Sequence, residues 1–183
     1  MEDKNQNLLI EEIAQRTMQE YRTVIRSLFD TDSSEVVHNA SLEHAAVILE
    51  EMVRRAKLSF FAIAKNLNEK AWNSKVVQAL VEARRRGVVV ELLVTDSDRQ
   101  NLTHLKNWDA TVIPCIKMVS EAVRKKEKLL HNFAVMDQKA FRYEVDQTKA
   151  TAVFGANNPK YALSAFAWFL DLKKGAVPLA PVL

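Results

Sequence analysis

The sequence predicts an α/β fold in which a mixed β-sheet is sandwiched between helices. Strand-like segments at 57–64 and 88–94 alternate with a helix-like segment at 74–86, an order typical of strands joined by crossover helices. Three further segments with strand character follow one another closely near the C-terminus, at 130–136, 140–145 and 149–154. Such short spacing predicts antiparallel neighbours, so the sheet should contain both strand directions.

The first element is an amphipathic helix over residues 8–29. Its apolar side chains recur mostly at spacings of three and four: Leu8, Leu9, Ile13, Met18, Tyr21, Val24, Ile25, Leu28 and Phe29. A polar break at 30–34 follows, and residues 36–39 form either a short strand or a loop. A second helix begins after Ser41, whose hydroxyl can cap it.

The segment 88–94 is the strongest strand signal in the chain. Its nearly continuous apolar, β-branched character predicts a central strand covered by helices on both faces. Gly87 ends the preceding helix in a left-handed conformation. Beyond the strand we expect a short helix to about Leu105 and an edge strand at 110–113. Residues 117–127 are charged and form either a helix or a loop.

A last helix is predicted at 159–172, and a tail follows it. Two prolines exclude a regular helix over 175–183, so this tail either packs as an extended strap or is disordered. The pattern as a whole predicts an N-terminal helical extension at 1–35, a main domain at 36–174 and the tail.

Composition describes a globular protein of mildly basic charge. The chain has 183 residues, of which 48% are hydrophobic and 27% charged, with a formal net charge of +3. This charge permits nucleic-acid or acidic partners but does not require them. Cys115 is the single cysteine, which excludes a disulfide framework within the chain. No signal peptide or bilayer-spanning segment is visible, so we expect a cytoplasmic protein.

The sequence gives no sign of a metal or cofactor. His38, His44 and His104 lack metal-ligand spacing, and the three glycines form no phosphate-binding loop. We therefore expect neither.

Two apolar segments near the C-terminus carry polar residues of the kind found in active sites. A histidine and an asparagine lie within 130–136, which ends at Asp137. The segment 149–154 stops at Gly155-Ala156-Asn157-Asn158, just before the last helix.

This pattern resembles the phospholipase D-like superfamily, in particular its nuclease-type members with one motif per chain. That family carries H-x-K-x4-D on one strand and a G-S-x-N turn on a later one. The corresponding positions here are Leu130, Asn132 and Asp137 in the first motif and Gly155, Ala156 and Asn158 in the turn. The resemblance also covers the order of elements over about 38–172.

The resemblance implies a site that has lost its chemistry. In the family, histidines act as nucleophile and acid in phosphodiester cleavage, while the lysine, serine and asparagine hold the phosphate. Leu130 cannot attack phosphorus, and Asn132 offers hydrogen bonds without charge. Relatives with one motif per chain dimerise to bring two motifs together, so the resemblance also implies a homodimer.

His131 is the one remaining candidate nucleophile. Neighbouring side chains on a strand point to opposite faces, so if Leu130 and Asn132 line the former site, His131 faces away from it. We expect it to be hydrogen-bonded beneath a helix instead. A shifted register would place His131 of two subunits in one shared site.

Several residues can still bind a phosphate or a nucleic acid. A basic segment directly precedes the motif strand and should line the rim of the former site: Arg124, Lys125, Lys126 and Lys128. A solvated loop is an equal interpretation. Asn132, Asn158 and the start of the last helix can hold a phosphate, although Asn158 can also simply cap that helix. Arg84–Arg86 suit a helix C-terminus, and Trp72 and Trp108 either stack on a base or cover the core.

The sequence therefore predicts a catalytically inactive phospholipase D-like protein that binds nucleic acid or a protein partner. Two alternatives remain open. One is an active phosphodiesterase or nuclease with a dimeric site built around His131. The other is a scaffolding protein that docks through helix 8–29.

Overall fold

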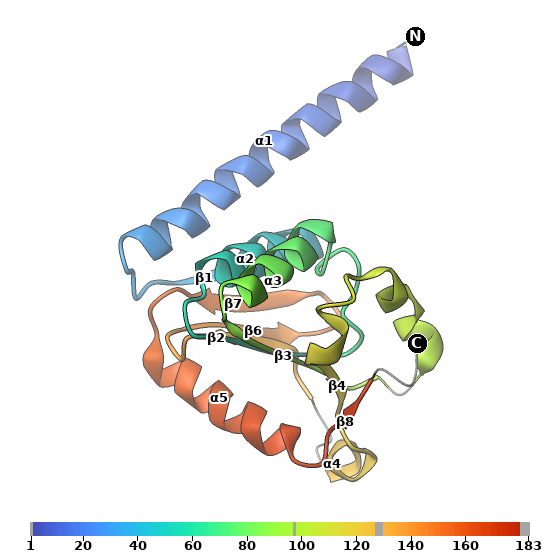
Figure 1. Cartoon of the computed structure of the whole chain (residues 1–183). Helices are drawn as coiled ribbons and strands as arrows, with labels where there is room; N and C mark the ends of the chain where they lie inside the picture. Colours follow the sequence, from blue (N-terminus) through green and yellow to red (C-terminus); the bar gives the residue numbers. More distant parts are fainter. Residues whose placement is uncertain (1, 97, 127–129, 180–183) are drawn as a thin grey trace.

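The computed structural model describes residues 2–96, 98–126 and 130–179, with side chains from residue 15 onward, Arg99 excepted. Figure 1 shows a single sheet with helices on both faces. Its eight strands run in the order β1-β7-β6-β5-β2-β3-β4-β8. Their bounds are β1 Val36–Asn39, β2 Ser59–Ala64, β3 Val89–Val94, β4 Ile116–Met118, β5 Phe133–Met136, β6 Ala140–Asp146, β7 Thr151–Gly155 and β8 Val177–Pro178.

The sheet is mixed, as the sequence predicts. Strands β2, β3 and β4 are parallel, and all other pairings are antiparallel. Strand β2 is buried along its whole length because β3 and β5 flank it. The apolar segment at 88–94 forms β3, next to β2 in the middle of the sheet.

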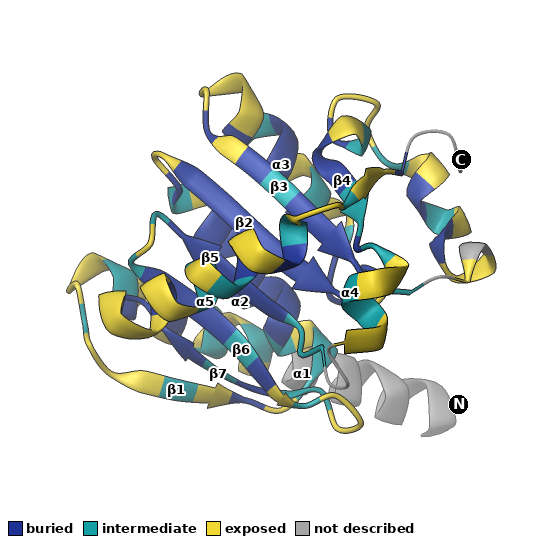
Figure 2. Cartoon of the chain, turned by 90° about the horizontal axis from the view of Figure 1, so that it is seen from below, coloured by how far each residue is buried: buried dark blue, intermediate teal, exposed yellow. Residues whose placement is uncertain are grey.

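Helices cover the two faces unequally. Helices α1 (Glu2–Asp30), α2 (Leu42–Arg55) and α3 (Ser74–Arg85) lie over one face, and α5 (Pro159–Lys173) lies over the other. Two apolar clusters result, a large one beneath the first three helices and a smaller one beneath α5. Figure 2 shows the α5 side, where β1 remains exposed at the border of the sheet.

The second half of α1 is part of the main core. Ile25 and Leu28 are buried within the larger cluster. The same stretch is tied to α2 by ion pairs from Arg22 to Glu50 and from Arg26 to Glu51. The first half of the helix extends past the body of the molecule (Figure 1). Removing residues 1–30 would therefore take away core side chains as well as a surface helix.

Most predicted elements are present, but the predicted edge strand at 110–113 is wrong. Residues Ile113–Cys115 form a 3-10 turn around Pro114, and the strand follows it as β4. Proline supplies no N–H for a ladder and fixes its own backbone, which favours the turn. The helix expected after β3 is a 3-10 helix over Arg99–Asn107, and a short helix, α4, spans Glu121–Lys126.

The tail packs as an extended strap as far as the structure describes it. Val177 and Pro178 pair with β4, and Leu179 is buried. None of the helices in the described residues combines the length and apolarity of a bilayer-spanning segment.

Candidate functional site

Asn132 lies where three strands meet at one edge of the sheet. It directly precedes β5, and the backbone N–H of Lys65, just after β2, donates to its side-chain oxygen at 2.8 Å. Strand β3 ends beside Lys65, because the Thr95 N–H donates to the carbonyl of Ala64 at 3.1 Å. We use the name motif edge for this end of the sheet, where the last residues of β2 and β3 lie beside the first residues of β5.

A buried polar cluster adjoins Asn132. Its amide donates to Glu144 Oε2 at 3.1 Å, and Arg142 Nη1 lies 3.5 Å from the same oxygen. Arg142 is 4% exposed and Glu144 5% exposed. Both point to the α2 side because they alternate with Tyr143 along β6. This pair is not among the site residues predicted from the sequence, although two charges at i and i+2 within an apolar strand are a visible signal.

The guanidinium of Arg142 keeps unused hydrogen-bonding capacity. Its Nε and Nη2 are buried without a partner among the described residues, as is the hydroxyl of Tyr21. Burial lowers the pKa of Arg142, an effect that Glu144 opposes, and burial raises the pKa of Tyr21 to about 12. A cavity of about 40 Å³ lined in part by Asn132, Arg142 and Glu144 adjoins the guanidinium. This volume suits ordered water rather than a phosphate group.

His131 and Leu130 lie on the opposite face of the sheet from Asn132. The Nδ1–H of His131 donates to the backbone carbonyl of Glu144 at 3.0 Å, and its ring packs on Tyr143 with centroids 5.2 Å apart. Leu130 packs against the apolar cluster beneath α5. Leu130 and Asn132 therefore do not share a face, because residues 130–132 precede the first residue of β5 and need not alternate as a strand does.

A basic rim surrounds the motif edge. Helix α4 lies beside the end of β3, where Arg124 Nη1 donates to the carbonyl of Thr95 at 3.4 Å. Lys125 pairs with Glu121 at 2.7 Å, while the side chains of Lys65 and Lys126 are exposed. Lys128 lies outside the described residues. We use the name basic rim for Lys65, Arg124, Lys125 and Lys126.

Asp137 lies at the opposite edge of the sheet, which we call the turn edge. Its carboxylate accepts hydrogen bonds from the backbone N–H groups of Lys57, Leu58 and Ser59, at 2.7–2.9 Å. It occupies the left-handed region at φ 51° in the β5–β6 turn. Asp137 thereby joins this turn to the start of β2.

The turn Gly155–Asn158 also lies at the turn edge. Asn158 donates its backbone N–H to Lys139 and its amide to the carbonyl of Ser34. Asn158 is the N-cap residue of α5, as predicted, but its side chain makes no capping hydrogen bond. A Cβ at Gly155 would lie 2.8 Å from the ring of Phe141, which explains the glycine. Strand β5 separates Asn132 from this turn, so the two asparagines cannot hold one phosphate.

Arg86 and the two tryptophans contact other parts of the same chain. Arg86 donates to the carbonyls of Val53, Arg54 and Ala56, which end α2. Trp72 packs within the core, and Trp108 packs beside it with ring centroids 6.4 Å apart. Within the part of the chain that the structure describes, no group of three or more His, Cys, Asp or Glu could hold a metal ion.

Known structures share this fold. The chain is similar to TrmBL2, an archaeal chromatin protein whose structure shows a novel mode of DNA binding. The TM-score is 0.62 and the sequence identity 14%, and the match covers 97% of this chain and 67% of that one. It is similar to Nuc from Salmonella typhimurium, a phospholipase D family member (TM-score 0.55, 20% identity, 78% and 94% coverage). It is also similar to NucT from Helicobacter pylori (TM-score 0.57, 10% identity, 79% and 99% coverage).

No protein-family model and no curated protein sequence matches the chain. The structural similarity defines the class: the chain has the phospholipase D-like fold, with the mixed sheet and flanking helices that its sequence predicts.

Proposed function

We propose that this chain is a non-catalytic phospholipase D-like protein that binds nucleic acid at the motif edge. The observation that carries the proposal is the basic rim beside Asn132, at the position where the family motif has lost its histidine and lysine. Phosphate contacts by lysine and arginine supply most of the affinity of sequence-independent nucleic-acid binding.

The surroundings of the motif support binding rather than cleavage. Leu130 is engaged in apolar packing, and His131 donates to a backbone carbonyl on the far face of the sheet. Donation from Nδ1 leaves the lone pair on Nε2, but the ring packs on Tyr143, on the opposite face of the sheet from Asn132. It therefore does not face a phosphate held at the basic rim. Asn132, Glu144 and Arg142 offer hydrogen bonds and charge but no comparable nucleophile.

Electrostatics at the rim favour an anionic polymer. Glu127 follows Lys126 directly in the sequence and lies outside the described residues. Within α4 the acidic residue is Glu121, which is paired with Lys125. Asp171 acts electrostatically on Lys126 but is paired with Lys174. Asp96 accepts hydrogen bonds from the Asp98 backbone and the Asn101 amide. Lys65, Arg124 and Lys126 then remain as the positive groups that a phosphate backbone can contact.

Fluorescence anisotropy with a labelled DNA duplex over a range of salt concentrations tests the proposal. Three phosphate contacts predict a slope of log K against log salt of roughly −3. The double variant Lys65→Glu/Lys126→Glu should weaken binding by roughly tenfold or more at low salt. The control Lys57→Glu/Lys160→Glu carries the same net charge, but its exposed positions lie at the turn edge. Equal losses in both variants would show that only overall charge matters, and no binding at all would reject the proposal.

A phosphodiesterase assay separates this proposal from the enzymatic alternative. We expect no metal-independent turnover of bis(p-nitrophenyl) phosphate by the purified protein. Turnover that disappears in His131→Ala would establish a catalytic role for His131 and overturn the non-catalytic assignment.

We also propose that two copies associate through the α5 side of the sheet. A groove of about 660 Å³ lies between α5 and strands β6, β7 and β1, with Phe141, Tyr143 and Trp168 in its lining. Tyr161 and Val36, also in the lining, are 54% and 39% exposed. The groove reaches β1, the terminal strand of the described sheet, so a second copy could pair along β1 and cover the apolar side chains together.

Light scattering coupled to size exclusion measures the mass and tests this association. A dimer is expected for the natural chain and a monomer for Tyr161→Glu, with Leu163→Glu, exposed on α5 outside the groove lining, as the matched control. A monomeric natural chain, or dimers in both variants, would contradict this interface.

A further inference from the structure

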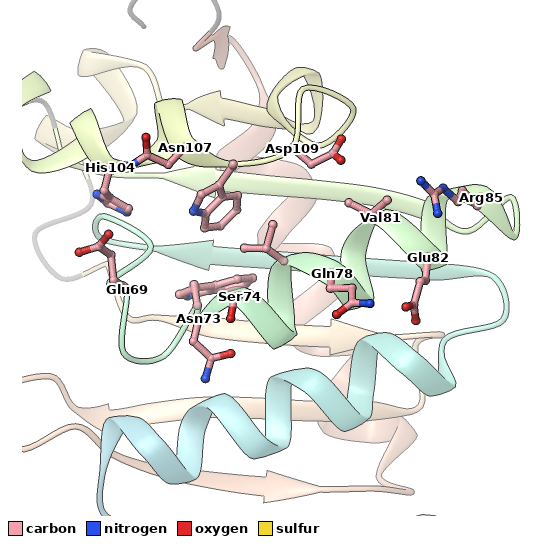
Figure 3. A pocket seen from close by; sticks show the side chains of 13 residues that line it. Glu69, Asn73, Ser74, Gln78, Val81, Glu82, Arg85, His104, Asn107 and Asp109 are labelled. Carbon is pink, nitrogen blue, oxygen red and sulfur yellow. The ribbon is translucent and has the colours of Figure 1, made fainter.

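A second groove, remote from the dimer surface, runs along the outer side of α3. It has a volume of about 600 Å³, within the range of small-molecule sites. One wall is a single stripe of α3, formed by Ser74, Val77, Gln78, Val81, Glu82 and Arg85. The facing wall comes from the segment that contains His104, Asn107, Trp108 and Asp109 (Figure 3). From Ser74 to Arg85 the helix rises by about 16 Å, which sets the length of the groove.

Two tryptophans form the aromatic part of the groove. Trp72 is only 6% exposed and is held edge-on against Phe60, with ring centroids 6.4 Å apart. Trp108 is half-buried and lies beside Trp72 at an interplanar angle of 33°. Because Trp72 is anchored in the core, the groove presents a fixed aromatic surface on which a ring can stack.

Polar side chains with unused hydrogen-bonding capacity line the same groove. Among the described residues, the side chains of Glu69, Gln78 and Asn107 make no hydrogen bond or ion pair. By contrast, the ring of His104 is fixed, with Nε2 3.1 Å from the carbonyl of Leu67. The free amides both donate and accept, and the carboxylate accepts, which matches the hydroxyl group.

The charge of the groove disfavours a nucleic-acid phosphate, the ligand proposed for the basic rim. Three carboxylates line it, on Glu69, Glu82 and Asp109, against the single guanidinium of Arg85. Glu82 already pairs with Arg54 at 3.0 Å. A phosphate would meet like charge here. Arg54 and Arg85 offset two of the three carboxylates, so the groove suits an uncharged polar ligand.

We propose that this groove binds a neutral, hydroxyl-rich ring compound of the size of a mono- or disaccharide. The ring stacks on Trp108 beside Trp72, and its hydroxyl groups bond to Gln78, Asn107 and Glu69. This site is independent of nucleic-acid binding at the motif edge.

Tryptophan fluorescence of the full chain tests the proposal, with glucose and maltose as probes. We expect a dissociation constant of about 1 mM, so the fluorescence change should approach saturation at about 10 mM sugar. Trp108→Ala should weaken binding about tenfold. Gln78→Ala/Asn107→Ala alters only exposed side chains, so it should fold normally and also weaken binding. Trp168→Phe, on the other face of the sheet, and Gln100→Ala, exposed outside the groove, should bind as the natural chain does.

Four results would overturn the proposal. The first is no saturable response to either sugar. The second is tighter binding of spermidine, which would make the groove a site for organic cations. The third is tighter binding of adenosine, which would identify an aromatic base as the preferred ring. A sugar response unchanged in both groove variants would place the ligand elsewhere and reject this site.

Discussion

The motif edge and the turn edge of the sheet differ in what their side chains do. At the turn edge, Asp137 accepts three backbone hydrogen bonds and Gly155 permits close packing against Phe141. At the motif edge, Leu130 and Asn132 occupy the positions that our proposed alignment gives to the family's histidine and lysine. In that proposed alignment, Asp137 and Gly155 match the family pattern, and both have a task in the fold.

This difference distinguishes residues that stabilise the fold from residues that would be needed only for a reaction. A residue that holds strands together is needed whether or not the protein reacts with anything. A nucleophile has no such second task, so its place can be taken by an apolar side chain without loss of the fold. The motif edge also contains a buried charge pair, Arg142 and Glu144, whose contribution can be measured.

The largest effect is expected from breaking this pair. Glu144→Ala leaves a buried guanidinium without its carboxylate and should lower the free energy of unfolding by about 3–5 kcal/mol. Urea denaturation measures the change. The double variant Arg142→Met/Glu144→Leu removes both charges and should recover most of the loss. If the single and double variants are equally unstable, packing rather than charge is what the pair provides.

Asp137→Ala should have the next largest effect. Three backbone N–H groups at the start of β2 lose their acceptor, which should lower the free energy of unfolding by about 2–3 kcal/mol. Asp146→Ala is a suitable control because Asp146 is also half-buried and accepts from a backbone N–H, that of Thr148, within its own turn. A loss at Asp137 no greater than at Asp146 would remove the contrast between the two edges.

His131→Ala should have a smaller effect, confined to stability. It removes one hydrogen bond to the Glu144 carbonyl and a ring contact with Tyr143, together worth about 1 kcal/mol. Affinity for DNA should not change, because the ring faces away from the basic rim. A DNA-binding defect in a folded His131→Ala protein would show that the two faces are coupled.

The smallest effect is a pH dependence near the motif edge. His44 stacks on Tyr21, and burial lowers the pKa of its imidazole, with a smaller opposing influence from Glu43. The unfolded chain therefore binds the proton more readily. Stability should fall as pH drops below the ordinary histidine value of about 6.5 and level off below the folded pKa. In His44→Gln this part of the pH profile should disappear, and its persistence would assign it to another group.

Local patterns were sufficient for much of the fold. The apolar periodicity of 8–29, the cap at Ser41 and the β-branched segment at 88–94 all correspond to observed elements. The cap is direct, since Ser41 accepts the His44 N–H at 3.1 Å. These signals depend on neighbours in the sequence, which is why they could be read without the structure.

Other features depend on contacts between distant segments. Strand β4 has three residues and exists because β3 and the tail strand β8 flank it. The edge at which Gly155–Asn158 lies depends on the direction of β7, which the order of elements does not reveal. Arg142 and Glu144 could have been noticed, but their partner Asn132 is known only from the β5–β6 pairing.

Pro178 determines how far this sheet can grow. It forms the border strand β8 together with Val177, and it has no N–H to offer a further strand. The border at β1 carries no proline. Copies joined at β1 would therefore present proline-ended strands at both outer borders. Such a pair is a closed assembly that resists polymerising into fibres, even though each copy carries an exposed strand.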